Sequence, residues 1–132
     1  MNNLKYLIGL VIVAALIYGG VMYSKKPAET KPAEPIMIDE AGVKVFNVSG
    51  ANFRFDPVTI TVKKGDQVKI IFESLDMQHD LDIDEFDVNS PVIPAGESSE
   101  IEFTADQVGE FEYYCSVGSH RANGMVGTLI VE

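Results

Sequence analysis

The most informative stretch of this 132-residue chain runs from Glu110 to Val131 and reads Glu-Phe-Glu-Tyr-Tyr-Cys-Ser-Val-Gly-Ser-His-Arg-Ala-Asn-Gly-Met-Val-Gly-Thr-Leu-Ile-Val. Apolar side chains alternate with polar ones before Cys115 and again around Leu129, which is typical of strands with one buried face. The residues between these two segments are rich in glycine, which allows a tight loop. The stretch therefore predicts two strands joined by a loop, with Cys115 facing inward at the end of the first strand.

Short strand patterns recur along the rest of the C-terminal two thirds of the chain, and no long helical stripe interrupts them. They fall in residues 43–49, 58–62, 67–73, 80–84 and 98–104. Several short strands separated by Gly, Pro and Asp are typical of a sandwich of two sheets. We therefore predict an all-β Greek-key β-sandwich of seven to eight strands.

The first of these segments has an irregular pattern. Val43 and Val45 are in one phase, whereas Phe46 and Val48 are in the other. A change of phase within a strand is the usual sign of an inserted residue or of a strand that passes from one sheet to another. We expect a bulge or a sheet switch in residues 43–49.

Four side chains of the chain form a candidate metal site. Cys115, the only cysteine, is spaced Cys-x4-His-x4-Met with His120 and Met125, and the second of the two histidines, His79, lies upstream after a predicted strand. Thiolate and thioether sulfur select copper, and a trigonal His₂Cys set with a weak axial Met is typical of blue-copper centres. We predict one type 1 copper ion at His79, Cys115, His120 and Met125.

Other interpretations of these residues are weaker. Taken singly, Cys115 and Met125 would be ordinary core side chains, and His79 would be a surface loop residue. Zinc accepts one Cys and two His, but its fourth ligand is more commonly Cys, His or carboxylate than Met. A dinuclear copper centre needs two bridging thiolates, and a cysteine nucleophile needs an oxyanion hole that the sequence does not indicate. We expect no enzyme activity.

The N-terminal third has a different composition. Residues 6–24 are free of charge and rich in Leu, Ile and Val, and as a helix they would span roughly 28 Å, near the thickness of a bilayer core. We predict a membrane anchor helix in residues 1–24, with a cleaved signal peptide as the alternative. Residues 25–38 contain three prolines and predict a semi-extended linker. Residues 39–132 then form the copper domain.

The orientation of this anchor is ambiguous. Lys5 precedes the apolar segment, whereas Lys25, Lys26 and Lys31 follow it. Counted alone, these charges would place the C-terminal side in the cytoplasm. A copper site implies the opposite side, so we expect a single-pass protein of the cell membrane whose copper domain is extracytoplasmic.

The charge of the chain limits its partners. The formal net charge is −10 at pH 7, which disfavours nucleic acid and favours basic partners. Residues 80–87, Asp-Leu-Asp-Ile-Asp-Glu-Phe-Asp, concentrate this charge. The segment has two interpretations, the solvated face of a strand or a docking patch for a basic protein such as a cytochrome.

Residues 51–132 resemble the cupredoxin family. The segment from Phe55 through Asp66 is similar to the opening strands of cupredoxins and of cytochrome oxidase subunit II, and Tyr114 through Leu129 is similar to their ligand loop and last strand. The Cys-x4-His-x4-Met spacing is most like that of rusticyanin and is also similar to that of azurin. The resemblance implies that His79, Cys115 and His120 are strong copper ligands and that Met125 is axial.

The resemblance also implies an electron port at the ring edge of His120, with Phe53, Phe55, Pro57, Val117 and Ala122 as candidates to line it. One departure concerns the residue after the first ligand histidine, which is Asn or Ser in many family members and Asp80 here. A carboxylate accepts a backbone N–H equally well, but its charge near copper favours Cu(II) and a lower potential. Arg121 could offset that charge or contact a partner.

The sequence therefore predicts a membrane-anchored blue copper protein that carries single electrons between redox partners, such as a basic cytochrome or a terminal oxidase. We expect it to be a monomer. Two alternatives are an extracytoplasmic copper storage or delivery protein and an ancillary copper subunit of a terminal oxidase.

Overall fold

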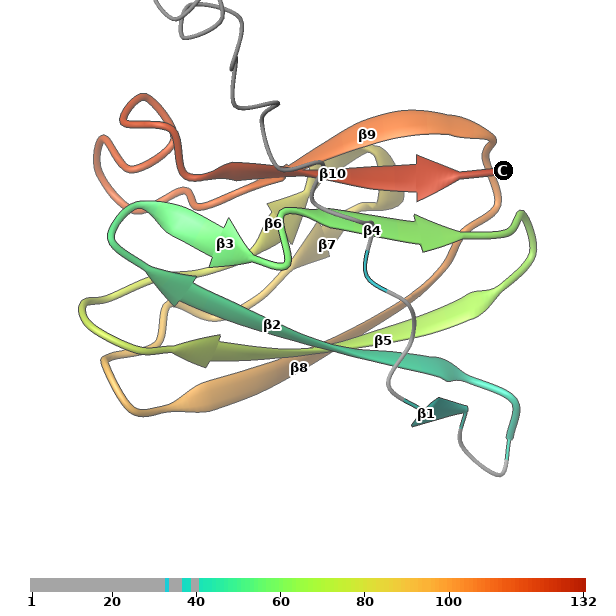
Figure 1. Cartoon of the computed structure of the whole chain (residues 1–132), viewed down its shortest axis with the longest axis horizontal. Helices are drawn as coiled ribbons and strands as arrows, with labels where there is room; N and C mark the ends of the chain where they lie inside the picture. Colours follow the sequence, from blue (N-terminus) through green and yellow to red (C-terminus); the bar gives the residue numbers. More distant parts are fainter. Residues whose placement is uncertain (1–32, 34–36, 39–40) are drawn as a thin grey trace, which may run out of the picture.

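The computed structural model describes Ala33, Met37–Ile38 and residues 41–132. This part of the chain forms two facing β-sheets, and its only helix is the 3₁₀ turn η1 (Figure 1). The elements are β1 (Met37–Ile38), β2 (Lys44–Ala51), β3 (Arg54–Asp56), β4 (Thr59–Val62), β5 (Gln67–Ser74), β6 (Asp82–Ile83), η1 (Asp84–Phe86), β7 (Val88–Asn89), β8 (Ser98–Thr104), β9 (Gly109–Tyr114) and β10 (Val126–Val131).

The chain passes repeatedly from one sheet to the other between successive strands. One sheet has the order β1-β2-β5-β8, with β3 also paired to β2, and the other has the order β4-β10-β9-β6-β7. The prediction of an all-β fold is confirmed. The described part contains ten strands where seven or eight were predicted, because β1, β3 and β7 have only two or three residues and are too short to show an alternation.

The predicted irregularity in residues 43–49 is wrong. Strand β2 pairs with β5 in parallel without interruption, from Lys44 opposite Val68 to Gly50 opposite Ser74, and it stays in one sheet. Phe46 belongs to the core between the sheets. Val45 faces the other side of the sheet, where it pairs with Met37 of β1 and is buried although it lies outside the core. The change of phase therefore reflects burial of Val45 on the outer face at the start of β2, since Asn47 on that face is exposed.

The core lies between the two sheets and is made of the inward-facing residues of strands from both sheets. It includes Phe46, Phe72 and Ile70 from one sheet and Ile60 and Leu129 from the other, all at most 1% exposed. Burial of such side chains contributes about 1.5–3 kcal/mol each. The core is therefore the rigid support from which the loops at the two ends of the sandwich extend.

One contact between neighbouring strands in this core is unusually close. The ring of Tyr113 on β9 covers Gly127 on β10, and a Cβ atom at Gly127 would lie 2.1 Å from the Tyr113 Cζ atom. The Tyr113 hydroxyl donates a hydrogen bond of 2.6 Å to the carbonyl oxygen of Pro57, which satisfies the polar end of the buried ring. Gly127 is thus required for the packing of Tyr113.

Part of the predicted linker has backbone pairings with the domain. Met37 and Ile38 form β1 beside β2, and Ala33 donates a backbone hydrogen bond of 2.9 Å to the oxygen of Thr59. The predicted anchor, residues 1–24, lies outside the described residues. Within the residues that are described, no helix is long and apolar enough to cross a membrane.

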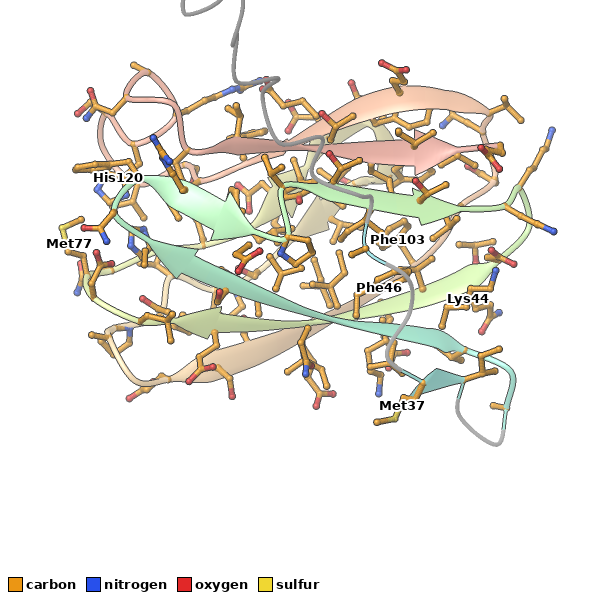
Figure 2. The ribbon with its side chains drawn as sticks, in the orientation of Figure 1. Met37, Lys44, Phe46, Met77, Phe103 and His120 are labelled. Carbon is orange, nitrogen blue, oxygen red and sulfur yellow. The ribbon has the colours of Figure 1, made fainter. Side chains whose placement is uncertain are left out.

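Three loops meet at one end of the sandwich, on the left of Figure 1. They are the β2–β3 turn at Asn52 and Phe53, the segment that follows β5, and the long loop between β9 and β10. Figure 2 shows Met77 of the second loop and His120 of the third at this same end, opposite Lys44. The sulfur and imidazole side chains of the predicted site all belong to these loops or to their edges.

Candidate metal centre

Cys115 directly follows β9, and its side chain is fully buried. This confirms the inward position predicted from the alternation of residues 110–115. Burial raises the pKa of the thiol to about 11, because the thiolate loses its hydration. The side chain of Asp80 raises this pKa further, whereas hydrogen bonds with the backbone of Asp80 and Val117 lower it. The thiol therefore ionises more readily when a cation is bound beside it.

His120 lies on the loop after β9, and this loop is closed by its own backbone hydrogen bonds. The His120 N–H donates to the oxygen of Val117 at 3.0 Å, and the N–H of Met125 donates to the oxygen of His120, also at 3.0 Å. Met125 in turn accepts a backbone hydrogen bond of 3.2 Å from Cys115. Residues 115, 120 and 125 are thus held together by the backbone of the loop itself.

His79 comes from a distant part of the chain and is fully buried. Its backbone exchanges two hydrogen bonds with Ile93, of 3.0 and 2.9 Å. Its ring Nε2–H donates to the Asp76 carboxylate at 2.7 Å, and this turns the other ring nitrogen, Nδ1, toward Cys115. Asp76 was not identified from the sequence, although Asp in a predicted loop is a common turn-forming residue.

The three side chains converge on one point. His79 Nδ1 lies 3.1 Å from His120 Nδ1, and the Cys115 Sγ atom lies 3.8 and 3.5 Å from these two nitrogens. Metal–ligand bonds of about 2.0–2.3 Å with bond angles of about 100–120° would separate such ligand atoms by about 3.1–3.8 Å. One thiol and two imidazoles at these separations fit a single copper ion. The three loops therefore bring together the three side chains that were predicted from the sequence to be the strong ligands.

Met125 is fully buried, and its backbone is hydrogen-bonded to His120 and Cys115 of this cluster. Its methyl group approaches β2, because a Cβ atom at Gly50 would lie 2.9 Å from Met125 Cε. The absence of a side chain at Gly50 therefore leaves room for the thioether. Gly50 was not identified from the sequence, since a lone glycine in a strand does not indicate what it approaches.

Asp80 links two of the loops by hydrogen bonds. One of its carboxylate oxygens accepts the backbone N–H of Ser116 at 2.6 Å, and the other accepts the hydroxyl of Ser116 in a short hydrogen bond. The carboxylate is 2% exposed, so it lies within the protein beside the residue that follows Cys115. Asp80 thus accepts a backbone N–H from the other ligand loop, as expected for a carboxylate at this position.

The interpretation of residues 80–87 as the solvated face of a strand is wrong for its first half. Asp80 and Asp82 are buried, whereas Asp84, Glu85 and Asp87 are exposed. The alternation was interpreted from residue types alone, and these types did not indicate that Ser116 of the β9–β10 loop contacts both Asp80 and Asp82. Desolvation, followed by repulsion from Asp80, raises the pKa of Asp82 to about 6.

This shift predicts the effect of pH on stability. The ordinary pKa of an aspartate is 3.8, so the folded state favours the protonated form of Asp82 and loses stability as the pH rises from 4 through 6. We expect Asp82→Asn to raise the free energy of unfolding of the copper-free protein at pH 7 by about 1–3 kcal/mol and to have little effect at pH 4. Urea titrations at the two pH values test this, and an equal gain at both would contradict it.

The surroundings of His120 are partly aromatic. The Phe53 ring meets the His120 ring edge to face, with 4.9 Å between the ring centres. Phe55, which was a candidate to line the same surface, instead lies in the core between Phe72 and Tyr113. Phe55 is inward on the short strand β3, whereas Phe53 is in the turn before it.

Arg121, next to His120, is engaged by neighbouring side chains. Its Nε–H donates to Glu112 at 2.8 Å, and its guanidinium lies 3.7 Å from the centre of the Tyr114 ring. The Tyr114 hydroxyl donates to Asp84 at 2.7 Å. Arg121 is therefore paired with an acid of β9, and it makes no ion pair with Asp80.

The sandwich and the Cys–His₂ cluster at its loop end define a class, the small β-sandwich metalloproteins with a mononuclear copper site. The particular family follows from sequence comparison. The model of the cupredoxin-like domain matches residues 12–131, and the chain belongs to this family.

Individual relatives agree with this assignment. The chain is 27% identical to the copper-resistant cuproprotein CopI of Rubrivivax gelatinosus, over 79% of this chain and 75% of the relative. It is 32% identical to the chloroplastic plastocyanin of Tetradesmus obliquus, over 70% of this chain and 67% of that protein. Among solved structures, auracyanin A of Chloroflexus aurantiacus, a blue copper protein, superposes with a TM-score of 0.62 at 22% identity and covers 69% of this chain and all of its own.

Proposed function

We propose that this chain is a membrane-anchored mononuclear blue copper protein that carries single electrons between redox partners. The observation that supports this most directly is the convergence of His79 Nδ1, Cys115 Sγ and His120 Nδ1 within 4.8 Å in a cupredoxin-like domain. These three side chains are the strong ligands of the proposal, and Met125 is the weak axial one.

The proposed ligands have different roles in electron transfer. A copper ion held by His79, Cys115, His120 and Met125 would supply the Cu(I)/Cu(II) couple, and the backbone hydrogen bonds of the loop would hold residues 115, 120 and 125 in place. Cys115 and His79 are fully buried, whereas the ring of His120 is partly exposed. His120 is therefore the ligand through which an electron enters or leaves, and the edge-to-face contact with Phe53 holds its ring in place.

The location and the partners are part of the same proposal. The uncharged residues 6–24 support a single membrane-spanning anchor, and the copper chemistry favours an extracytoplasmic domain. The net charge of −10 favours basic redox partners, and their association would slow with added salt. The exposed acids of residues 80–87 are candidates for such contacts, namely Asp84, Glu85 and Asp87.

A visible spectrum with copper analysis of the purified full-length chain tests the function. We expect one copper per chain and an intense thiolate-to-copper band in the oxidised protein that disappears on reduction. Full reoxidation by a one-electron acceptor, with return of the same band, is expected of a carrier. A chain that binds copper only as Cu(I) and never develops the band contradicts the proposal.

A second candidate is copper handling, and it rests on the similarity to CopI, which is named for copper resistance. In that function the copper itself is transferred, whereas in a carrier only the electron is. Incubation of the loaded protein with a competing copper chelator distinguishes the two. We expect copper to be retained in both oxidation states, because two of the three strong ligands are fully buried. Rapid loss of Cu(I) would favour handling.

Met125 is expected to tune the potential more than it contributes to binding. Met125→Leu removes a weak axial donor, which destabilises Cu(II) relative to Cu(I), so the potential should rise. Met125→Gln offers a harder oxygen donor and should lower it. Protein-film voltammetry measures both. If both variants keep the potential of the parent protein, Met125 is only a core side chain.

A further inference from the structure

The Asp76 carboxylate makes three hydrogen bonds at the loop end of the sandwich. Its Oδ1 atom accepts the Nε2–H of His79 at 2.7 Å and the backbone N–H of Met77 at 2.8 Å. Its Oδ2 atom accepts the backbone N–H of Asn52 at 2.7 Å. One side chain therefore connects the segment after β5 with the β2–β3 turn.

The hydrogen bond to His79 determines which ring nitrogen is available to a metal. An ionised carboxylate only accepts hydrogen bonds, so the proton of a neutral His79 ring must be on Nε2. The lone pair is then on Nδ1, the atom that faces Cys115 and His120. A carboxylate on the far nitrogen of a ligand imidazole also increases the basicity of the ring.

The hydrogen bond to Asn52 acts on the other histidine. Asn52 and Phe53 both have left-handed backbone conformations, with φ of 51° and 58°, which non-glycine residues adopt at a cost. The Asp76 carboxylate holds the first of them, and the ring of the second packs edge to face on His120 at 4.9 Å. Figure 2 shows His120 and Met77 at this end of the sandwich.

We propose that Asp76 is a positioning residue of the metal centre, which fixes the Nε2–H tautomer of His79, supports His120 through the Asn52–Phe53 turn, and favours Cu(II) by its charge. This inference rests on the proposed copper function for its redox part only. The tautomer and the turn are properties of the chain without metal, so the two parts are tested separately.

The redox part is tested with Asp76→Asn in the full-length chain. The amide oxygen can still accept from His79 and Met77, whereas the charge and the hydrogen bond to Asn52 are lost. We expect the preference for Cu(II) over Cu(I) to fall about tenfold, which for a one-electron couple is a rise of about 59 mV. Glu73→Gln is the matched control, because it removes the same charge from an exposed residue of nearby β5.

The position of the visible band provides the second readout of these variants. Asp76→Asn should keep the band near its parent position, whereas Asp76→Ala, which removes all three acceptors, should shift or broaden it. A rise of potential in Asp76→Asn no larger than in Glu73→Gln would overturn the redox part. If the parent chain develops no band at all, the proposed function fails instead, and this outcome is distinct.

The tautomer part is tested on the copper-free chain by ¹⁵N NMR of the histidine ring nitrogens. We expect His79 of the parent protein to be mainly the Nε2–H tautomer. In Asp76→Ala the two tautomers should become comparably populated, and Asp76→Asn should restore the parent pattern. An unchanged His79 tautomer in Asp76→Ala would overturn the assignment of Asp76 as a positioning residue.

Discussion

Cys115→Ser is expected to abolish the intense visible band completely. The band arises from charge transfer between thiolate sulfur and copper, and a serine hydroxyl is neither soft nor ionised near neutral pH. The side chain is fully buried and 3.5–3.8 Å from the ring nitrogens of both histidines, and the sequence contains no second cysteine that could supply a thiolate. Visible absorption after addition of Cu(II) measures the loss.

The fold of this variant should survive, because Ser and Cys have similar volumes and the loop is closed by backbone hydrogen bonds. Far-ultraviolet circular dichroism therefore serves as the control for folding. Ser116→Ala is a matched variant, since it removes a neighbouring hydroxyl that donates to Asp80 but leaves the thiol in place. A parent-like band in folded Cys115→Ser would place the copper ligands elsewhere.

Gly127→Ala is expected to be the most destabilising single-methyl change in the described part of the domain. The new Cβ would lie 2.1 Å from Cζ of Tyr113, whose ring is fully buried and whose hydroxyl is fixed on Pro57. The ring or the strand must move, and the free energy of unfolding should fall by about 3 kcal/mol or more. Urea denaturation of the copper-free protein measures this cost.

A second background separates this clash from a general intolerance of β10 to alanine. In Tyr113→Leu the ring and its hydrogen bond are absent, so the added methyl of Gly127→Ala meets a smaller side chain. The cost of Gly127→Ala should be at least halved there, as expected of directly contacting residues. Equal costs in both backgrounds would show that Tyr113 is not the cause.

Several features were predictable from short stretches of sequence. Strand β8 covers residues 98–104 as predicted, and β9 (Gly109–Tyr114) differs from the predicted residues 110–115 by one residue at each end, because strict alternation is a local property of the chain. The proximity of Cys115, His120 and Met125 is local in the same sense, since ten residues with glycines can close only a small loop. The ligand types themselves indicated copper.

The tertiary structure alone determined what covers each face and which loops meet. Asp80 and Asp82 follow the alternation of an exposed strand face, yet both are buried, because the pattern says which residues share a face and not what packs against it. Asp76 and His79 are close in sequence, but the contacts of Asp76 with Asn52 and of Phe53 with His120 join segments that are 24 or more residues apart. Such contacts depend on how the two sheets place their loops at one end, and no local pattern of residues encodes that placement.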